Sequence, residues 1–193
     1  MDRLAPTHQV DLGDDDALRR AVRDLTAVQA IRNLSAIYSM AVDDHDLDTV
    51  VDCFTPDGSF ERAGATTTGH ADLRAFYRMM MERYRTTLHV PEAHVVELDP
   101  SDPDGASGVV TGHGELVLDA TLMMAAYRYA DTYRCTDGRW KFASRSLRFM
   151  YAMPIEQMAT GFGSSRRIRW PEQPFAEADI PEGLPTWSNH LDS

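Results

Sequence analysis

The sequence of 193 residues has few of the features that mark several protein classes. It contains two cysteines, Cys53 and Cys135, which form neither a CxxC metal pattern nor a disulfide framework. A reducing, cytoplasmic compartment is therefore expected. Basic residues are also few, since 19 Lys and Arg against 30 Asp and Glu give a formal net charge of −11. This charge would repel a phosphate backbone, and we expect no nucleic-acid partner.

Long hydrophobic runs and the common phosphate-binding and hydrolase motifs are missing as well. No apolar stretch approaches the roughly 18–20 residues that a membrane helix needs, so no membrane partner is expected. The N-terminus has no basic segment followed by an apolar one, and no signal peptide is expected. A glycine-rich phosphate loop, a GxSxG elbow and an HExxH motif are all absent. We therefore expect no cofactor.

The hydrophobic pattern predicts one domain of the α+β class, because helices come first and long antiparallel strands follow. Residues 1–13 are polar and are expected to form a flexible arm, and residues 14–153 the folded domain. Apolar residues from Leu18 to Ala41 recur every three or four positions, which predicts a long amphipathic helix. Further helices are expected at 46–54 and 71–85. Strands are expected at 59–62, 86–98, 107–120, 121–135 and 139–151. Within the fourth of these strands, residues 123–126 fit a helix equally well.

The C-terminal segment, residues 154–193, differs from the rest of the chain. It contains five prolines and few periodic apolar residues, so no regular core element is expected there. Two alternatives remain open. The segment either wraps around the domain or a neighbouring subunit, or it is partly disordered.

Three polar residues, Asp43, His89 and His113, are candidates for acid–base chemistry. Histidine has the unperturbed pKa closest to neutrality and is suited to general acid–base catalysis. His89 begins a predicted strand, and His113 lies between two glycines in the next one, which indicates room for a ligand or a bend. Asp43 ends the first predicted helix, where a negative charge opposes the helix dipole. We hypothesise that the three side chains meet in one cavity.

Each of these residues also has a purely structural explanation. His89 would serve equally as a capping or packing histidine, His113 as a hydrogen-bonded histidine at a bend, and Asp43 as a solvated helix end. Side chains alternate along a strand, so His94 is expected to point away from the face of His89 and into solvent. Histidines on opposite faces cannot ligate one metal, and we expect no zinc site.

Aromatic and methionine side chains are numerous enough to build both a core and a ligand pocket. Such residues are more typical of a core, but some are expected to line an apolar cavity for a small-molecule substrate. The candidate substrate-binding residues are Phe54, Phe60, Met80, Tyr84, Tyr127 and Phe149.

Several short motifs resemble the SnoaL-like branch of the nuclear-transport-factor-2-like superfamily over roughly residues 20–150. They are the helical segment 31–54, the turn Phe54-Thr55-Pro56-Asp57-Gly58-Ser59-Phe60, the strand start Thr87-Leu88-His89 and the hairpin Asp137-Gly138-Arg139-Trp140-Lys141-Phe142. Each motif is short, but their order and spacing are specific. The resemblance implies a cone-shaped α+β barrel, in which a curved antiparallel sheet and N-terminal helices enclose a deep pocket.

Within that superfamily the sequence is most similar to the scytalone dehydratases and, more loosely, to the bile-acid 7α-dehydratases. This resemblance implies cofactor-free elimination of water from a hydroxyl group β to a carbonyl. It places Asp43, His89 and His113 where those enzymes carry an aspartate and two strand histidines. His89 would remove the proton α to the carbonyl and protonate the leaving hydroxyl, and a pair of His113 and Asp43 would fix the tautomer.

The resemblance also implies a group that stabilises the developing enolate. Tyr38 precedes Asp43 at the spacing seen in the bile-acid enzymes, and an arginine on the last strand, Arg145 or Arg148, is the other candidate. The chain departs from the scytalone dehydratase pattern at Val42, where a tyrosine is expected.

We therefore expect a dehydratase or isomerase that acts on an apolar cyclic or polyketide-like carbonyl compound. Two alternatives remain open: a polyketide cyclase or epoxide hydrolase that uses the same pocket, and a non-catalytic binding protein or accessory subunit. Relatives form dimers and trimers, so a homodimer or homotrimer is expected.

Overall fold

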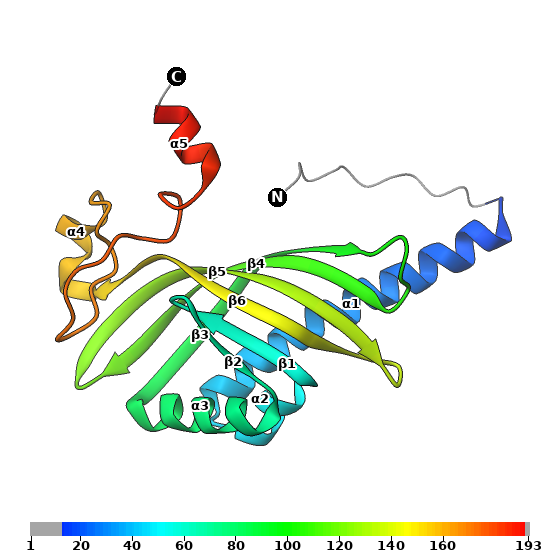
Figure 1. The fold of residues 1–193 in the computed structure, drawn as a ribbon, viewed down its shortest axis with the longest axis horizontal. Helices are drawn as coiled ribbons and strands as arrows, with labels where there is room; N and C mark the ends of the chain where they lie inside the picture. The colour runs from blue at the N-terminus through cyan, green and yellow to red at the C-terminus, as the bar shows by residue number, and fades with distance from the viewer. Residues whose placement is uncertain (1–12, 192–193) are drawn as a thin grey trace.

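A strongly curved six-stranded sheet forms the centre of the computed structural model, which describes residues 13–191 (Figure 1). The strand order is β2–β1–β6–β5–β4–β3, so that β2 and β3 are the two edges and the sheet is an open cone. β1 and β6 run parallel, and the other neighbours are antiparallel. The strands are β1 (Phe54–Arg62), β2 (Ala65–Thr68), β3 (Tyr84–Leu98), β4 (Gly105–Leu118), β5 (Thr121–Thr136) and β6 (Arg139–Pro154).

The long helix α1 (Asp15–Asp43) packs against the concave face of the sheet through its C-terminal half. Asp14 caps its start, where one carboxylate oxygen accepts hydrogen bonds from two backbone N–H groups. The buried positions begin at Ile31, whereas Leu25 is 70% exposed, and the N-terminal turns extend beyond the sheet (Figure 1). The helix stops at Asp43, and His45 takes a positive φ of 57° as the chain turns into α2.

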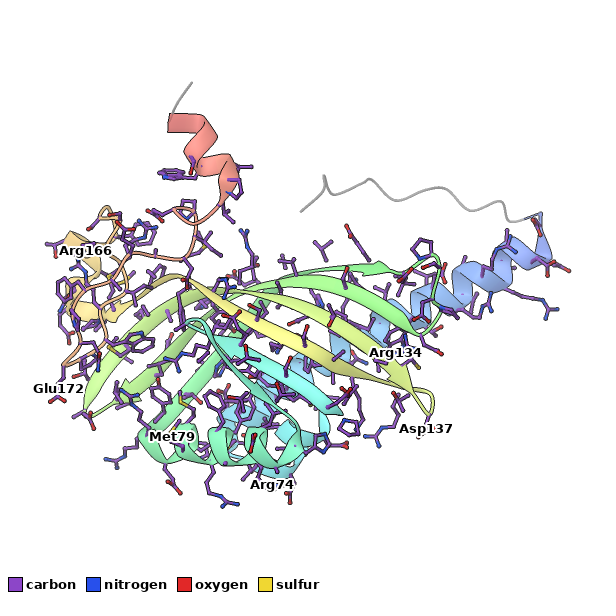
Figure 2. The ribbon with its side chains drawn as sticks, viewed as in Figure 1. Arg74, Met79, Arg134, Asp137, Arg166 and Glu172 are labelled. Atoms are coloured by element: carbon purple, nitrogen blue, oxygen red, sulfur yellow. The ribbon has the colours of Figure 1, made fainter. Side chains whose placement is uncertain are left out.

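Two shorter helices, α2 (Leu47–Asp52) and α3 (His70–Arg83), close the open side of the cone. α3 buries Leu73 and Tyr77 toward the sheet, and Arg74 forms an ion pair of 2.6 Å with Asp48 of α2. Figure 2 shows side chains of α3 and the strands between the helix and the sheet, whereas Met79 of α3 is exposed. The α+β class with N-terminal helices around a curved sheet is thus confirmed.

A bulge in β3 changes which side chains face the inside of the cone. The register of β3 against β4 shifts between Pro91 and His94, so that His94 pairs with Val110, whose side chain is buried. His94 is therefore half-buried on the inner face, beneath α1, and not on a solvated face as strict alternation predicted. The segment 123–126, which also fitted a helix, forms part of β5.

The C-terminal segment packs along the end of β6. It contains a 3₁₀ turn (Ile155–Gln157) and the short helices α4 (Met158–Gly161) and α5 (Pro185–Leu191). Ile168 forms bridges to Ala152 and to Ala176, and Arg167 pairs with Glu182. In Figure 2 this segment, marked by Arg166 and Glu172, lies at the opposite end of the sheet from the hairpin of Asp137.

Two further expectations concern the ends of the chain and membranes. The predicted N-terminal arm lies outside the described residues, except for Gly13. Within residues 13–191, none of the helices is long and apolar enough to cross a membrane.

Candidate active site

The Asp43 carboxylate and the His89 imidazole form a closely connected pair. One carboxylate oxygen lies 2.6 Å from His89 Nδ1, and the other accepts the backbone N–H of His89 at 2.8 Å. The Thr87 hydroxyl donates a third hydrogen bond of 2.8 Å to the carboxylate. Because α1 ends beside the first residues of β3, the helix end and the strand position one another. Two of the predicted catalytic residues are therefore brought together.

The hydrogen bonds to Asp43 determine the tautomer of His89. Partial burial alone would raise the pKa of Asp43, but the hydrogen bonds from His89 and Thr87 outweigh it and hold that pKa below its ordinary value. An ionised carboxylate can only accept hydrogen bonds, so Nδ1 of His89 carries a proton. In the neutral imidazole Nε2 is then unprotonated, and it has no hydrogen-bond partner among residues 13–191. This nitrogen is free to act as a base.

His89 lies in the wall of a largely apolar cavity between the concave face of the sheet and α3. The cavity has a volume of about 100 Å³. Tyr38 lines the cavity, and so do five of the six predicted substrate-binding residues: Phe60, Met80, Tyr84, Tyr127 and Phe149. Phe54 does not: it is fully buried in the core, where its ring contacts Tyr38, Tyr77 and Phe142.

A cluster of tyrosines, Tyr38, Tyr77 and Tyr129, supplies hydrogen-bond donors to the cavity. The hydroxyls of Tyr38 and Tyr77 lie 2.8 Å apart, so one donates to the other and the acceptor keeps its own proton to donate. Burial raises the pKa of all three tyrosines above the ordinary value. They are thus neutral donors at neutral pH, suited to a carbonyl oxygen that gains negative charge.

His113 lies on the opposite face of the sheet from His89. In the β3–β4 register His89 pairs with Gly114, whereas His113 pairs with Val90, so the two histidines are out of phase by one residue. His113 Nδ1 contacts a carboxylate oxygen of Glu92 at 3.3 Å, and its side chain is 37% exposed. The predicted pair of His113 and Asp43 is therefore wrong.

The glycines around His113 make room for a tyrosine ring. A Cβ atom on Gly112 would lie 2.8 Å from Cζ of Tyr127, whose side chain crosses β4 on the inner face. The Tyr127 ring lies 6.1 Å from the His89 ring between centroids. The glycine pattern thus marked a close approach beside the site, although the histidine between the glycines points away from it.

Neither of the predicted arginines reaches the cavity. Arg145 is fully buried and forms two hydrogen bonds to Asp131, from Nε at 3.0 Å and from Nη2 at 2.8 Å, and a further one to Ser35. Arg148 is exposed on the other face and pairs with Glu61. The role of Arg145 at the substrate is therefore contradicted, since Asp131 holds its guanidinium behind the tyrosines. The guanidinium stacks on the rings of Tyr38, Tyr129 and Phe142.

Many residues of the cavity wall were not predicted from the sequence, and Arg62 and Trp170 are two of them. Arg62 ends β1 two residues after Phe60, so strand alternation places both on the inner face, and this signal was available. Trp170 belongs to the C-terminal segment, where no periodic pattern indicates which side chains turn toward the domain. In the described part of the chain no group of three or more His, Cys, Asp or Glu residues could hold a metal ion.

The comparisons with known proteins agree with this architecture. A family model described as a SnoaL-like domain matches residues 23–146. A Mycobacterium tuberculosis protein of unknown function is similar at 26% identity, over 65% of this chain and 77% of that one, with a TM-score of 0.59. No curated protein sequence matches the chain.

Two further solved structures share the fold at lower identity. A hexachlorocyclohexane dehydrochlorinase from Novosphingobium barchaimii is 19% identical over 70% of this chain and 94% of that one, with a TM-score of 0.62. A Novosphingobium aromaticivorans protein provisionally described as a scytalone dehydratase is 17% identical over 80% and 99%, with a TM-score of 0.64. The family match spans more than half of the sequence and includes both Asp43 and His89. The chain therefore belongs to the SnoaL-like domain family.

Proposed function

We propose that the protein is a cofactor-free enzyme that catalyses acid–base elimination or isomerisation of an apolar, ring-containing carbonyl compound. Elimination of water from a β-hydroxy ketone is the reaction that the site supports best. The observation that carries this proposal is the Asp43–His89 pair, whose free Nε2 belongs to a side chain in the wall of an apolar cavity. Membership of the SnoaL-like family, and a fold shared with dehydratase-type and dehydrochlorinase structures, support a small-molecule-processing enzyme.

The first step is removal of the proton α to the carbonyl by Nε2 of His89. The electron pair of the broken C–H bond moves toward the carbonyl oxygen and forms an enolate, while the imidazole becomes an imidazolium. Asp43 stabilises this cation through the short hydrogen bond to Nδ1. A hydroxyl of the Tyr38–Tyr77 pair donates to the enolate oxygen, and the low polarity of the cavity strengthens both interactions.

The second step returns the proton to the leaving group. The enolate electrons re-form the carbonyl and shift the double bond to the α and β carbons, which breaks the C–O bond. The departing hydroxyl takes the proton from Nε2 of His89 and leaves as water, so that the imidazole is neutral again. If the substrate carries a β,γ double bond in place of the β-hydroxyl, loss of the α proton gives a dienolate, and return of that proton from Nε2 to the γ carbon gives the conjugated isomer.

The test is a screen of β-hydroxy ketones on aromatic and alicyclic rings, followed by the absorbance of the conjugated enone product. Replacement of His89 by Asn is expected to lower turnover by about 10²–10⁴, the usual contribution of one acid–base group. His113→Asn is the matched control, because this histidine faces away from the cavity and its loss leaves turnover unchanged. Near-normal turnover by the His89 variant would refute the proposal.

Product analysis separates the alternatives that use the same base. Cyclisation or epoxide opening would consume the substrate without forming a conjugated enone. A β-chloro ketone tests elimination of a halide, which leaves as an anion and needs no proton from His89. The predicted homodimer or homotrimer and the cytoplasmic location stay predictions.

A further inference from the structure

Arg62 is a partly buried arginine in the cavity wall that has no acidic partner among the described residues. Its Nη1 lies 3.7 Å from Sδ of Met80, and its guanidinium lies over the rings of Phe149 and Trp170, at 5.8 Å and 5.4 Å from their centroids. Among residues 13–191 no carboxylate forms an ion pair with it. This is unexpected in a chain with 30 acidic residues and a net charge of −11.

Three arginines of β6 and the C-terminal segment have carboxylate partners: Arg145 pairs with Asp131, Arg148 with Glu61, and Arg167 with Glu182. Arg169 lies over an aromatic ring as Arg62 does, but it donates to oxygens of Arg166 and Gln157. A cation that is held among apolar walls loses hydration and gains most from an anion placed beside it. For Arg62 the described residues supply no such anion within ion-pair distance, and its place in the cavity wall exposes it to a ligand there.

We propose that Arg62 binds an anionic group, a carboxylate in the first place, on the apolar ring compound that occupies the cavity. The Phe149 and Trp170 rings pack edge-to-face on each other, at 5.7 Å between centroids, and both lie beside the guanidinium. Nη1 contacts Met80, whereas the edge formed by Nε and Nη2 has no hydrogen-bond partner among residues 13–191. This edge presents parallel donors that match the two oxygens of a carboxylate. Because the neighbouring side chains position the guanidinium in advance, little conformational entropy is lost on binding.

The location of Arg62 also determines how such a ligand lies in the cavity. Arg62 is on β1 and His89 on β3, and β6, β5 and β4 separate these strands in the curved sheet. The Asp43 carboxylate repels an anion at the β3 side, whereas Arg62 attracts it at the β1 side. The carbon acid is thereby directed toward His89. This inference rests on the proposed function only in that the cavity is the substrate site.

The experiment measures binding of two probes of the same shape, 2-naphthoate and the uncharged 2-naphthamide, by isothermal titration calorimetry. The wild-type protein is expected to bind the naphthoate more tightly than the amide. Arg62→Gln is expected to weaken naphthoate binding by about 10- to 100-fold, as for a lost charge-assisted hydrogen bond, and to change amide binding by less than about threefold. Arg62→Lys retains the positive charge without the paired donors, so its affinity for naphthoate should lie between those of the wild type and Arg62→Gln.

Arg78→Gln is the matched control, because it removes the same charge from the exposed side of α3. It should bind both probes like the wild type. The inference is overturned if the wild type binds neither probe or shows no preference for the anion. It is also overturned if Arg62→Gln keeps that preference, or if it weakens both probes equally.

The binding experiment is independent of the proposed reaction. His89→Asn should keep the preference for naphthoate, since the base does not contact the anionic group. If that variant also keeps full turnover, the proposed reaction fails while the ligand class stands. If instead His89→Asn loses turnover and Arg62→Gln keeps its anion preference, the reaction stands and the ligand class fails.

Discussion

Two histidines of β3, His89 and His94, lie five residues apart on the inner face of the cone but belong to different kinds of site. His89 uses one ring nitrogen for Asp43 and has the other free beside the cavity. His94 Nε2 lies 3.0 Å from the hydroxyl of Tyr133, which donates in turn to Asp131, the partner of Arg145. The two networks thus differ in one respect. The His94 network connects buried groups to one another, whereas the Asp43–His89 pair leaves one ring nitrogen without a partner among the described residues, beside the cavity.

The energetic roles of the two regions differ accordingly. The side chains of Asp131 and Arg145 are buried completely and form an ion pair, and Arg145 also donates to Ser35 of α1, although its Nη1 has no hydrogen-bond partner among the described residues. This network links α1 to the sheet. The Asp43–His89 pair is partly exposed to the cavity, with 17% and 18% of its side chains accessible. We therefore expect mutations in the first region to change stability and mutations in the second to change turnover.

The largest expected effect is that of Asp43→Asn on catalysis. The amide no longer stabilises the imidazolium or selects the Nδ1–H tautomer, so turnover should fall by about 10²–10⁴. The free energy of unfolding should fall by only about 1–2 kcal/mol, the range for one hydrogen-bonded group. Steady-state kinetics on the substrate found by screening measures turnover, and urea denaturation measures the free energy of unfolding. Asp44→Asn, at the exposed neighbouring position, should change neither, and an active Asp43 variant would contradict the comparison.

Arg145→Met should lower stability more than Asp43→Asn does. It leaves Asp131 buried without a counter-charge, which costs about 3–5 kcal/mol of unfolding free energy. The double variant Arg145→Met with Asp131→Leu removes both charges and should recover part of that loss. Urea denaturation of the two variants is the measurement. Equal stability of the single and double variants would show that the ion pair is not what holds the network together.

Stability below neutral pH should depend on His94. Burial, with the nearby charges of Arg145 and Arg32, lowers the pKa of His94 from 6.5 to about 4, although Asp131 opposes this shift. Between these two pH values the unfolded chain binds a proton that the folded chain does not, so stability falls as pH falls. After allowance for the solvent exposure of this side chain, the loss should be about 1–2 kcal/mol.

Replacement of His94 by Gln tests this pH dependence directly. Urea denaturation midpoints at pH 7 and pH 4.5 give the change in stability with pH for the wild type and for the variant. The variant should lose less stability on acidification than the wild type. Parallel curves would assign the acid sensitivity to other groups, of which Asp43 acts in the same direction at lower pH because its pKa is depressed.

The smallest effect is expected for Thr87→Val, which removes one of the three hydrogen bonds to Asp43. The pKa of Asp43 should rise toward its ordinary value, and the acidic limb of the pH–rate profile should move to higher pH. Turnover at neutral pH should fall by less than about tenfold, since two hydrogen bonds from His89 remain. A profile that does not move would mean that Thr87 does not influence the pair.

The fold and both members of the Asp43–His89 pair were accessible from the sequence because they depend on local pattern. The apolar stripe of α1, the long strand-forming runs and the short motifs specified the α+β cone, which the structure and the family match confirm. Asp43 and His89 were found because a helix end and a strand start are both visible in the sequence. Their contact follows from the way α1 ends beside β3.

The remainder of the site depends on single-residue register, which composition does not determine. His113 was predicted on the inner face, but it lies one residue out of phase with His89 and therefore faces outward. His94 was predicted to face outward, but the bulge in β3 turns its side chain to the inner face. Arg145 lies on the inner face of β6, but the choice between cavity and buried ion pair depended on Asp131 of the neighbouring strand. Arg62 was available from alternation after Phe60, and the sequence reasoning overlooked it.

Trp170 connects the cavity to a part of the chain that the family match does not include. The match ends at residue 146, whereas Trp170, which lies after β6 in the C-terminal segment, lines the cavity. The Asp43–His89 pair and part of the cavity wall are thus encoded in separable parts of the sequence. Under the proposed function, changes in the C-terminal segment are expected to alter which molecules fit the cavity without disturbing Asp43 or His89.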